Sequence, residues 1–298
     1  MSIIECVPNV SEGRRASVID ACARAIEDAG LPVLDVHTDP AHNRTVFTFA
    51  GAPAGVEAAA LALADVAVAA IDLRQHEGVH PRVGAIDVVP FVPIAGSTLG
   101  DCVALARAFG AEFARRHHVP VFLYEAAAAV VGRRRLEAIR RGGLAALAER
   151  MGTDDWRPDF GPVQPHPSAG VTVTGARAPL IAYNVNLASG RLEIAREIAR
   201  VLRESSGGMP CVKALGLPSV DRNLVQVSMN LTDFRVTSMR AVFDAVAREA
   251  AARGVSVAGS ELVGLVPAAA LTDEDAAHLR IAGYDGSQIL ERRLASRA

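Results

Sequence analysis

The chain has 298 residues, half of them hydrophobic, and a formal net charge of −2 at pH 7. This length can bury the core of one large domain or of two ordinary ones. The near-neutral charge excludes the strongly basic domain or stripe that is typical of nucleic-acid binders. One helix-like stretch is locally basic, and we interpret its arginines as a solvated face rather than a phosphate-binding patch. These residues are Arg133, Arg134, Arg135, Arg140 and Arg141.

The cysteines indicate neither a disulfide framework nor a structural zinc site. Cys6, Cys22, Cys102 and Cys211 lie far apart in the sequence, without a C-x-x-C pair, so we expect reduced, buried thiols. The N-terminus lacks the basic region and long apolar core of a signal peptide. The apolar stretch 52–73 is alanine-rich and interrupted by acidic residues, which favours a soluble helix over a membrane span. We expect a soluble cytoplasmic protein that binds neither nucleic acid nor a membrane.

The first half of the chain predicts a β-α-β-β-α-β order. Helical spacing of apolar residues indicates helices, and runs rich in Val, Phe and Thr indicate strands. The predicted elements are a strand at 3–7, a helix at 15–29, strands at 31–36 and 44–50, the alanine-rich helix within 52–73, and a buried strand at 83–92. This order is the split βαβ arrangement of ferredoxin-like domains.

The second half predicts the same order again. Its elements are a strand at 180–187, a helix at 192–204, strands at 212–217 and 223–229, a helix at 239–253, and a strand at 255–263. The repetition argues for two similar α/β layers. We therefore predict an α+β protein with two ferredoxin-like subdomains, residues 1–178 and 179–298.

The segment 154–175 differs in composition from both halves. It contains four prolines and three glycines, which favours an ordered loop or a linker without a regular element. Long loops in compact domains are often functional, and clefts between domains are favoured ligand sites. We therefore expect an active-site cleft between the two subdomains, where this segment passes.

The densest set of chemically useful side chains is His76-Glu77-Gly78-Val79-His80-Pro81-Arg82. An acid, two histidines and an arginine share one loop marked by glycine and proline. A histidine can take and return a proton near neutral pH, and an adjacent arginine can bind a carboxylate through two hydrogen bonds. The loop is therefore a candidate for acid–base chemistry on an anionic substrate.

Two other interpretations of this loop stay open. The letters H-E-x-x-H match a zinc-protease motif, which needs both histidines on one helical face. Gly78 and Pro81 are poor residues for such a helix, and no later segment supplies an evident third ligand. His76 can instead cap a helix end while His80 is an ordinary loop histidine. We expect no bound metal.

Two further stretches combine turn residues with possible ligands. In 5–13, Ser11 is a good N-cap, while Glu5 and Asn9 at a strand end can bind a ligand. In 37–45, Asp39-Pro40 and Asn43 are ordinary turn residues.

These motifs together resemble the formiminotransferase family. The likeness is carried by residues 5–9 and 11–13, 43–45, 80–82 with Gly84 and Asp87, 159–162, 174–177, Asn184, Asn186, 223–224, 226–228 and 259–267. It runs through nearly the whole chain in matching order. Family members consist of two ferredoxin-like subdomains, which agrees with the repeat found above. Because the chain stops at Ala298, we expect a stand-alone form without the cyclodeaminase domain that is fused on in animal members.

The resemblance implies roles for individual residues. His80 is similar to the family's catalytic histidine. The folate-binding segment corresponds to Gly161, Pro162, Val163, Gln164, Pro165, His166, Pro167, Ser168, Ala169 and Gly170. Ala169 stands where some relatives carry a larger aromatic residue. His37 stands where some carry an acid, a role that Asp39 can take.

The implied reaction transfers a formimino group from N-formimino-glutamate to N5 of tetrahydrofolate, a co-substrate. Both ligands carry carboxylates, so we expect Arg44, Arg82 and Arg177 to bind them. A single histidine can serve both proton transfers. We expect a homodimer. The alternatives are a folate-independent hydrolase of formimino- or formyl-glutamate, transfer from formyl-glutamate, and a folate-binding protein without catalysis.

Overall fold

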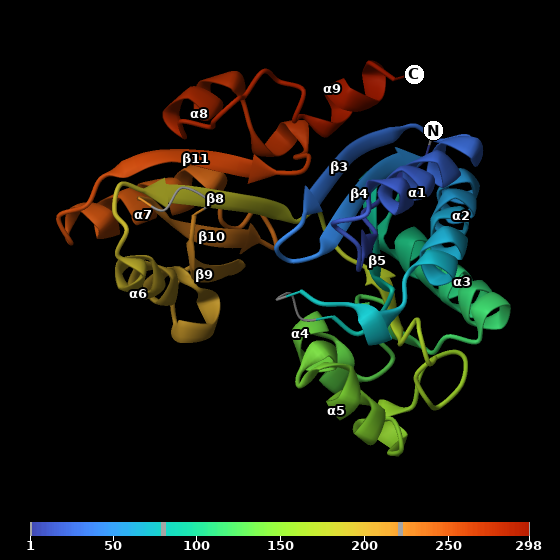
Figure 1. Ribbon diagram of the computed structural model, residues 1–298. Coiled ribbons are helices and arrows are strands. Elements are labelled where there is room, and N and C mark those ends of the chain that lie inside the picture. The colour runs from blue at the N-terminus through green and yellow to red at the C-terminus, as the bar shows by residue number, and fades with distance from the viewer. Residues whose placement is uncertain (1, 79–81, 220–222, 298) are drawn as a thin grey trace. The chain divides into compact units, whose positions relative to one another are not determined.

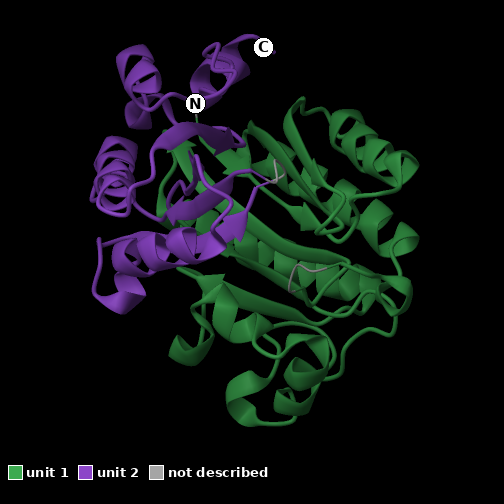
Figure 2. Cartoon of the chain, turned by 60° about the vertical axis from the view of Figure 1, so that its left-hand side comes forward, with its two compact units in different colours: residues 1–177 green, residues 178–298 purple. Residues whose placement is uncertain are grey.

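The computed structural model describes residues 2–78, 82–219 and 223–297. The chain forms two compact units, residues 1–177 and 178–298 (Figure 2). Each unit contains its own β-sheet and its own hydrophobic core. The predicted α+β class with two subdomains is confirmed.

Unit 1, residues 1–177, is built on a seven-stranded sheet. Both β1 and β2 lie between β4 and β5 and are antiparallel to them, so they form one strand that is interrupted at Val7 and Pro8. Beyond β5 follow β7 and then β6, both parallel, while β3 pairs with the other side of β4. The strands are β1 (Ile3–Cys6), β2 (Asn9–Val10), β3 (Val33–Asp39), β4 (Arg44–Gly51), β5 (Ile86–Ala95), β6 (Val121–Glu125) and β7 (Thr172–Ala176).

Helices cover the two faces of this sheet unequally (Figure 1). The long helices α1 (Ala16–Asp28), α2 (Pro53–Ala70) and α3 (Leu99–His117) pack on one face and share the main core with β1, β4 and β5. The short helices α4 (Leu136–Arg140) and α5 (Gly143–Arg150) contribute Ile139 and Leu147 to a second cluster with Phe122 and Val173 of β6 and β7. Since side chains alternate along a strand, this second cluster lies on the opposite face.

Within unit 1, the elements from β1 to β5 have the predicted β-α-β-β-α-β order and the ferredoxin-like pairing. The later part of the unit adds α3, β6, α4, α5 and β7 to this core. The interpretation of 154–175 as a segment without a regular element is wrong for its last residues, because β7 starts at Thr172 and pairs on both sides. The segment belongs to unit 1 and is not a linker between the units.

Unit 2, residues 178–298, is a four-stranded antiparallel sheet in the order β11-β8-β10-β9. This is again the ferredoxin-like order, with α6 and α7 packed on one face. Its elements are β8 (Ile181–Leu187), α6 (Leu192–Leu202), β9 (Val212–Pro218), β10 (Val225–Leu231), α7 (Met239–Ala251), β11 (Val257–Val263), α8 (Asp273–His278) and α9 (Leu290–Ala295). The described residues also form short 3-10 turns: η1 (Leu73–Gln75), η2 (Val131–Arg133), η3 (Asp154–Trp156), η4 (Glu204–Ser206) and η5 (Ala268–Ala270).

The helix α2 is, among the described residues, the one helix long and apolar enough to cross a membrane by length and composition. Its residues Val56, Leu63 and Ala67 are fully buried in the unit 1 core. It contacts α1 and α3 as well as the sheet. This packing is that of a core helix, which explains its high alanine content, since small side chains allow close helix contacts.

The cysteines are free thiols. Cys6, Cys22 and Cys102 are buried as predicted, whereas Cys211 is half-buried. Burial raises the pKa of the Cys22 and Cys102 thiols to about 12. These two thiols are therefore protonated packing groups rather than nucleophiles.

Candidate active site

Four loops of unit 1 meet at the end of the sheet where β5 begins. We call them the loop cluster: residues 11–15 before α1, residues 39–45 from the end of β3 to the start of β4, residues 76–78 and 82–87, and residues 166–171 before β7. Long-range hydrogen bonds join them, including Ser11 Oγ to Gly84 O at 2.7 Å and Thr45 Oγ1 to Glu12 O at 2.6 Å. The predicted candidates Asp39, Arg44 and Arg82 belong to these loops, and the predicted folate segment overlaps residues 166–171, while His80 lies between residues 78 and 82 in the sequence.

Asn43 connects three of these loops. Its Oδ1 accepts the Gly13 N–H at 2.8 Å, its Nδ2 donates to Glu77 O at 2.9 Å, and its own carbonyl accepts from His76 Nε2 at 3.0 Å. Its φ of 49° is left-handed, a conformation that asparagine tolerates better than most residues. The sequence indicated only a turn residue here, whereas the structure shows the central link of the loop cluster.

His76 and Arg82, which stand on either side of His80 in the sequence, are hydrogen bonded to each other. Arg82 Nη1 donates to His76 Nδ1, and Arg82 Nη2 donates to Gly78 O, each at 2.5 Å. Because Nδ1 accepts while Nε2 donates to Asn43, His76 is neutral in this arrangement. Burial and the neighbouring charge of Arg82 both lower the pKa of His76, which favours the same form. His76 has no ring nitrogen left for a metal.

His80 itself lies outside the described residues, so its assignment stays a prediction. Gly78 and Arg82, the nearest described residues before and after it, are hydrogen bonded to each other. On the C-terminal side, Asp87 Oδ1 accepts the N–H groups of Val83 and Gly84 at 2.7 and 3.2 Å. Asp87 Oδ2 in turn accepts from Arg140 Nη2.

The predicted folate segment ends directly beside this turn. Ala85 N donates to Ala169 O at 2.9 Å, and Val171 N donates to Val83 O at 2.8 Å. Gly170 has a φ of +70°, and a Cβ there would lie 2.3 Å from Val83 O, so this close approach requires glycine. His166 exchanges two backbone hydrogen bonds with Gly170, and its Nδ1 accepts from Ala169 N at 3.1 Å. The segment is thus an ordered loop, with Val163 half-exposed.

The strand register brings further candidates onto one sheet face, the face opposite α1, α2 and α3. Asn9 pairs with Val46 and Val88, Glu5 pairs with Val92, and Asp39 pairs with Arg44. Residues paired in this way point to the same face, and Cys6 and Val10, the strand neighbours of Glu5 and Asn9, enter the core on the other face.

Glu5 lies toward the far end of this face, away from the loop cluster. Its partner on β5 is Val92, whereas the loop cluster lies at Ile86, where β5 starts. Val92 and Ile86 are about 20 Å apart along the strand. Arg177 is at the same end, since its N–H donates to Phe91 O at 3.1 Å. Burial raises the pKa of Tyr124, and the charge of Arg177 acts in the opposite direction. The backbones of Glu5 and Arg177 are therefore at the same end of the sheet, away from the loop cluster.

Positive charge gathers around Asp87. Burial lowers the pKa of Arg44, the charge of Arg140 lowers it further, and Asp87 and Asp39 act in the opposite direction. Burial also lowers the pKa of Arg82, which Asp87 again opposes. Arg140 is the ion-pair partner of Asp87, and the further charges of Arg44 and Arg82 within electrostatic range of Asp87 favour the approach of an anionic ligand.

Asp39 acts within its own turn. Its Oδ1 accepts the N–H groups of Ala41 and His42, both at 2.9 Å, and its Oδ2 contacts His42 Nδ1. Burial raises the pKa of Asp39, but these hydrogen bonds outweigh it and the net pKa is lowered. A carboxylate held in this way is ionised at neutral pH and is a poor proton donor.

Two predictions about individual residues are wrong. Ser11 is not the N-cap of α1, since its hydroxyl donates to Gly84 O and the N-cap is Arg15. The arginines near residue 140 are not a uniformly solvated face. The side chains of Arg133 and Arg140 are only 4% and 13% exposed, because each forms an ion pair with a buried carboxylate. No local sequence signal marks Arg140, because its partner is 53 residues away.

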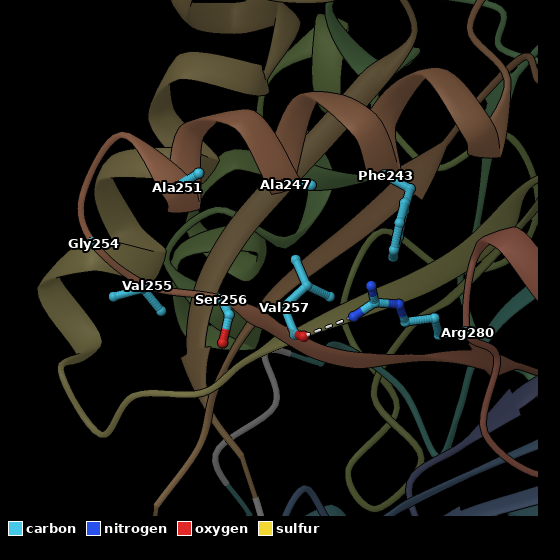
Figure 3. Close-up of a pocket in the computed structure, with 8 residues that line it drawn as sticks. All are labelled: Phe243, Ala247, Ala251, Gly254, Val255, Ser256, Val257 and Arg280. Carbon is cyan, nitrogen blue, oxygen red and sulfur yellow. Dashed lines mark hydrogen bonds between the residues drawn. The ribbon is translucent and has the colours of Figure 1, made fainter.

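The described residues offer neither a metal site nor, in unit 2, a pocket that includes predicted site residues. In the described ranges, no group of three His, Cys, Asp or Glu side chains could hold a metal ion. Unit 2 has a hollow of about 430 Å³ between the end of α7 and the start of β11, lined by Phe243, Val255 and Arg280 among others. Arg280 Nη1 donates to Val257 O at 3.2 Å (Figure 3). None of the predicted site residues lines this hollow.

Two family models match the chain. The N-terminal subdomain of the formiminotransferase domain matches residues 3–177, and the formiminotransferase domain matches residues 182–291. The chain belongs to the formiminotransferase family. In this family the formimino group passes from N-formimino-L-glutamate to a folate, and the chain is such a one-carbon group transferase.

Relatives of this formiminotransferase fall into two length classes. It is 42% identical over 294 residues to a glutamate formimidoyltransferase of Streptococcus pyogenes, covering 98% of both chains. A glutamate formimidoyltransferase of Thermoplasma acidophilum is also 42% identical, over 100% of this chain and 99% of the relative. The formimidoyltransferase-cyclodeaminase of Sus scrofa is 47% identical over 278 residues, which are 91% of this chain but 51% of that protein.

Proposed function

We propose that this formiminotransferase moves the formimino group of N-formimino-L-glutamate to N5 of tetrahydrofolate, with His80 as the residue that transfers protons. The products are 5-formimidoyltetrahydrofolate and glutamate. The observation that carries the proposal is the loop around His80. Hydrogen bonds hold its described flanks on both sides, and Ala85 on the C-terminal flank donates to Ala169 O of the predicted folate segment, in a chain of this family.

The chemistry requires two proton movements around one new bond. The N5 lone pair attacks the formimino carbon and forms a tetrahedral intermediate, and N5 loses its proton. The bond from this carbon to the glutamate nitrogen then breaks, and that nitrogen gains a proton. His80 can accept the first proton and return it to the leaving nitrogen, a role that typically contributes ~10²–10⁴-fold in rate.

The arginines of the sheet face are proposed to bind the carboxylates of the two ligands. Arg44 and Arg82 lie at the loop cluster, where the positive charge around Asp87 attracts an anion. Arg82 uses two N–H groups within its loop and keeps further donors for a ligand. Arg177 and Glu5 lie at the far end of the same face, and an elongated ligand such as a folate can extend from one end to the other, past Asn9.

One coupled assay tests this function. Purified protein is given N-formimino-glutamate or N-formyl-glutamate, each with and without tetrahydrofolate, and both glutamate release and the folate product are measured. We expect glutamate release only with the formimino donor and tetrahydrofolate together. Release without tetrahydrofolate would show a hydrolase, preference for the formyl donor would change the substrate, and folate binding without turnover would show a binding protein.

Three further properties are proposed with this function. The reaction needs no metal, because the folate carries the one-carbon unit, so activity should survive chelation in protein purified without added metal. We also propose a homodimer, which sedimentation of the full chain tests. A cytoplasmic location is proposed as well, since the cysteines are free thiols.

A further inference from the structure

Two buried arginines come from the part of unit 1 that extends its ferredoxin-like core. Arg133 ends η2 and Arg140 ends α4. The Nε of each is buried without a hydrogen-bond partner among the residues that the structure describes. Buried ion pairs are often no more stabilising than well-packed apolar side chains of similar volume. Stability alone is therefore a weak reason for two incompletely bonded guanidinium groups in one segment.

Arg140 acts on the turn that follows His80 in the sequence. It binds Asp87 Oδ2, while Asp87 Oδ1 holds the N–H groups of Val83 and Gly84. The helix that carries Arg140 is itself fixed. Arg150 donates to the carbonyls of residues 138 and 139 at 2.9 and 3.0 Å, and Ile139 is fully buried. Asp87 thus connects the turn to a helix whose position is fixed.

Arg133 acts on the residues that lead into the predicted folate segment. Its Nη1 donates to Arg157 O at 2.5 Å, and its Nη2 donates to Asp159 Oδ1 at 3.2 Å. Asp159 Oδ2 also accepts Leu123 N at 2.8 Å, which ties it to β6. The guanidinium lies 5.2 Å from the centre of the Phe122 ring, a cation–π contact that fixes it further.

We propose that residues 131–141 brace the active site, with Arg140 as a positioning residue for the His80 loop and Arg133 as a positioning residue for the folate segment. This rests on the proposed function, because it assigns one arginine to the chemical step and the other to folate binding. The two arginines therefore affect different constants. Loss of Arg140 lowers kcat, and loss of Arg133 raises the folate Kd.

The test uses Arg140→Met and Arg133→Met in the full chain, with the exposed neighbour Arg141→Met as a matched control. We expect Arg140→Met to lower kcat by up to about 10²-fold, because a misplacement of about 1 Å at the reacting groups has that effect. Its KM values and folate Kd should stay within about twofold. Arg133→Met should raise the folate Kd roughly tenfold while kcat changes little. Arg141→Met should behave like the wild type.

A double-mutant cycle separates positioning from a general structural effect. If Arg140 acts through His80, Arg140→Met should cost little further rate in a His80→Asn background. Equal losses in both backgrounds, or a changed folate Kd with normal kcat in Arg140→Met, would overturn the proposal. If the Met variants do not fold, Arg140→Lys and Arg133→Lys should show the same division in weaker form. A normal kcat in His80→Asn alone would contradict the proposed function and leave the two arginine phenotypes separately measurable.

Discussion

Replacing Asn43 should destabilise unit 1 by an amount that its contacts allow us to estimate. Asn43→Ala removes the hydrogen bonds to Gly13 N and Glu77 O, each worth about 1 kcal/mol. It also forces alanine into the left-handed conformation at a φ of 49°, which costs on the order of 1 kcal/mol. We therefore expect a loss of about 3 kcal/mol. In Asn43→Gly the conformational part is absent, so the loss should be near 2 kcal/mol, about two bonds.

The single tryptophan makes this measurable in the right unit. Trp156 is the only tryptophan of the chain and belongs to unit 1, where its ring lies 4.1 Å from the Arg150 guanidinium carbon. Its fluorescence during urea unfolding reports the free energy of unfolding of that unit. Asn43→Asp is an intermediate variant, because it keeps an acceptor for Gly13 N and loses the donor to Glu77 O. An Asn43→Ala variant within about 0.5 kcal/mol of the wild type, or an Asn43→Gly variant less stable than Asn43→Ala, would refute the reasoning.

Three further predictions concern the same loops. Arg82→Ala should raise the KM of at least one substrate by roughly one to two powers of ten, since charge-assisted hydrogen bonds contribute about 1.5–3 kcal/mol; unchanged KM values for donor and folate would remove Arg82 from the binding site. Because burial and Arg82 lower the pKa of His76 from 6.5, protonation opposes folding, and stability should be lost as pH falls below about 6.5. The wild-type unfolding midpoint should thus fall more steeply from pH 7 to pH 5 than that of His76→Asn, and equal slopes would contradict this. Gly170→Ala places a Cβ 2.3 Å from Val83 O and should weaken folate binding and lower the Tm, whereas Gly132→Ala, with nothing within 4 Å, should do neither.

Local patterns were sufficient for the repeated part of the fold. The spacing of apolar residues in 15–29 and 192–204 matches α1 and α6 to within two residues at each end, because amphipathic periodicity is set by the one face that each helix buries. The strand β7 was not predicted, because it is only five residues long and follows a proline-rich loop. Its assignment depends on pairing with β5 and β6, which are distant in the sequence.

Local sequence patterns predict less of the candidate site than of the fold, because its contacts join residues that are distant in the sequence. The loop around His80 was evident from its composition, and family resemblance supplied the segment 161–170. The roles of Asn43, Asp87 and Arg140 depend on contacts with residues that are 30 or more positions away in the sequence. Ser11 illustrates the reverse error, since its position suggested a local cap but its hydroxyl donates to a carbonyl 73 residues away. Local propensity cannot decide between a near and a distant partner when both satisfy the same donor.

The measurement that tests the central claim most directly is kcat and folate affinity of His80→Asn. His118→Asn is the control, because His118 is the C-cap of α3 with a φ of 54° that asparagine also adopts. We predict that His80→Asn lowers kcat by ~10²–10⁴-fold while the tetrahydrofolate Kd stays within about twofold. A His80→Asn variant that keeps more than about a tenth of the wild-type kcat would show that another group, or the substrates themselves, transfers the proton.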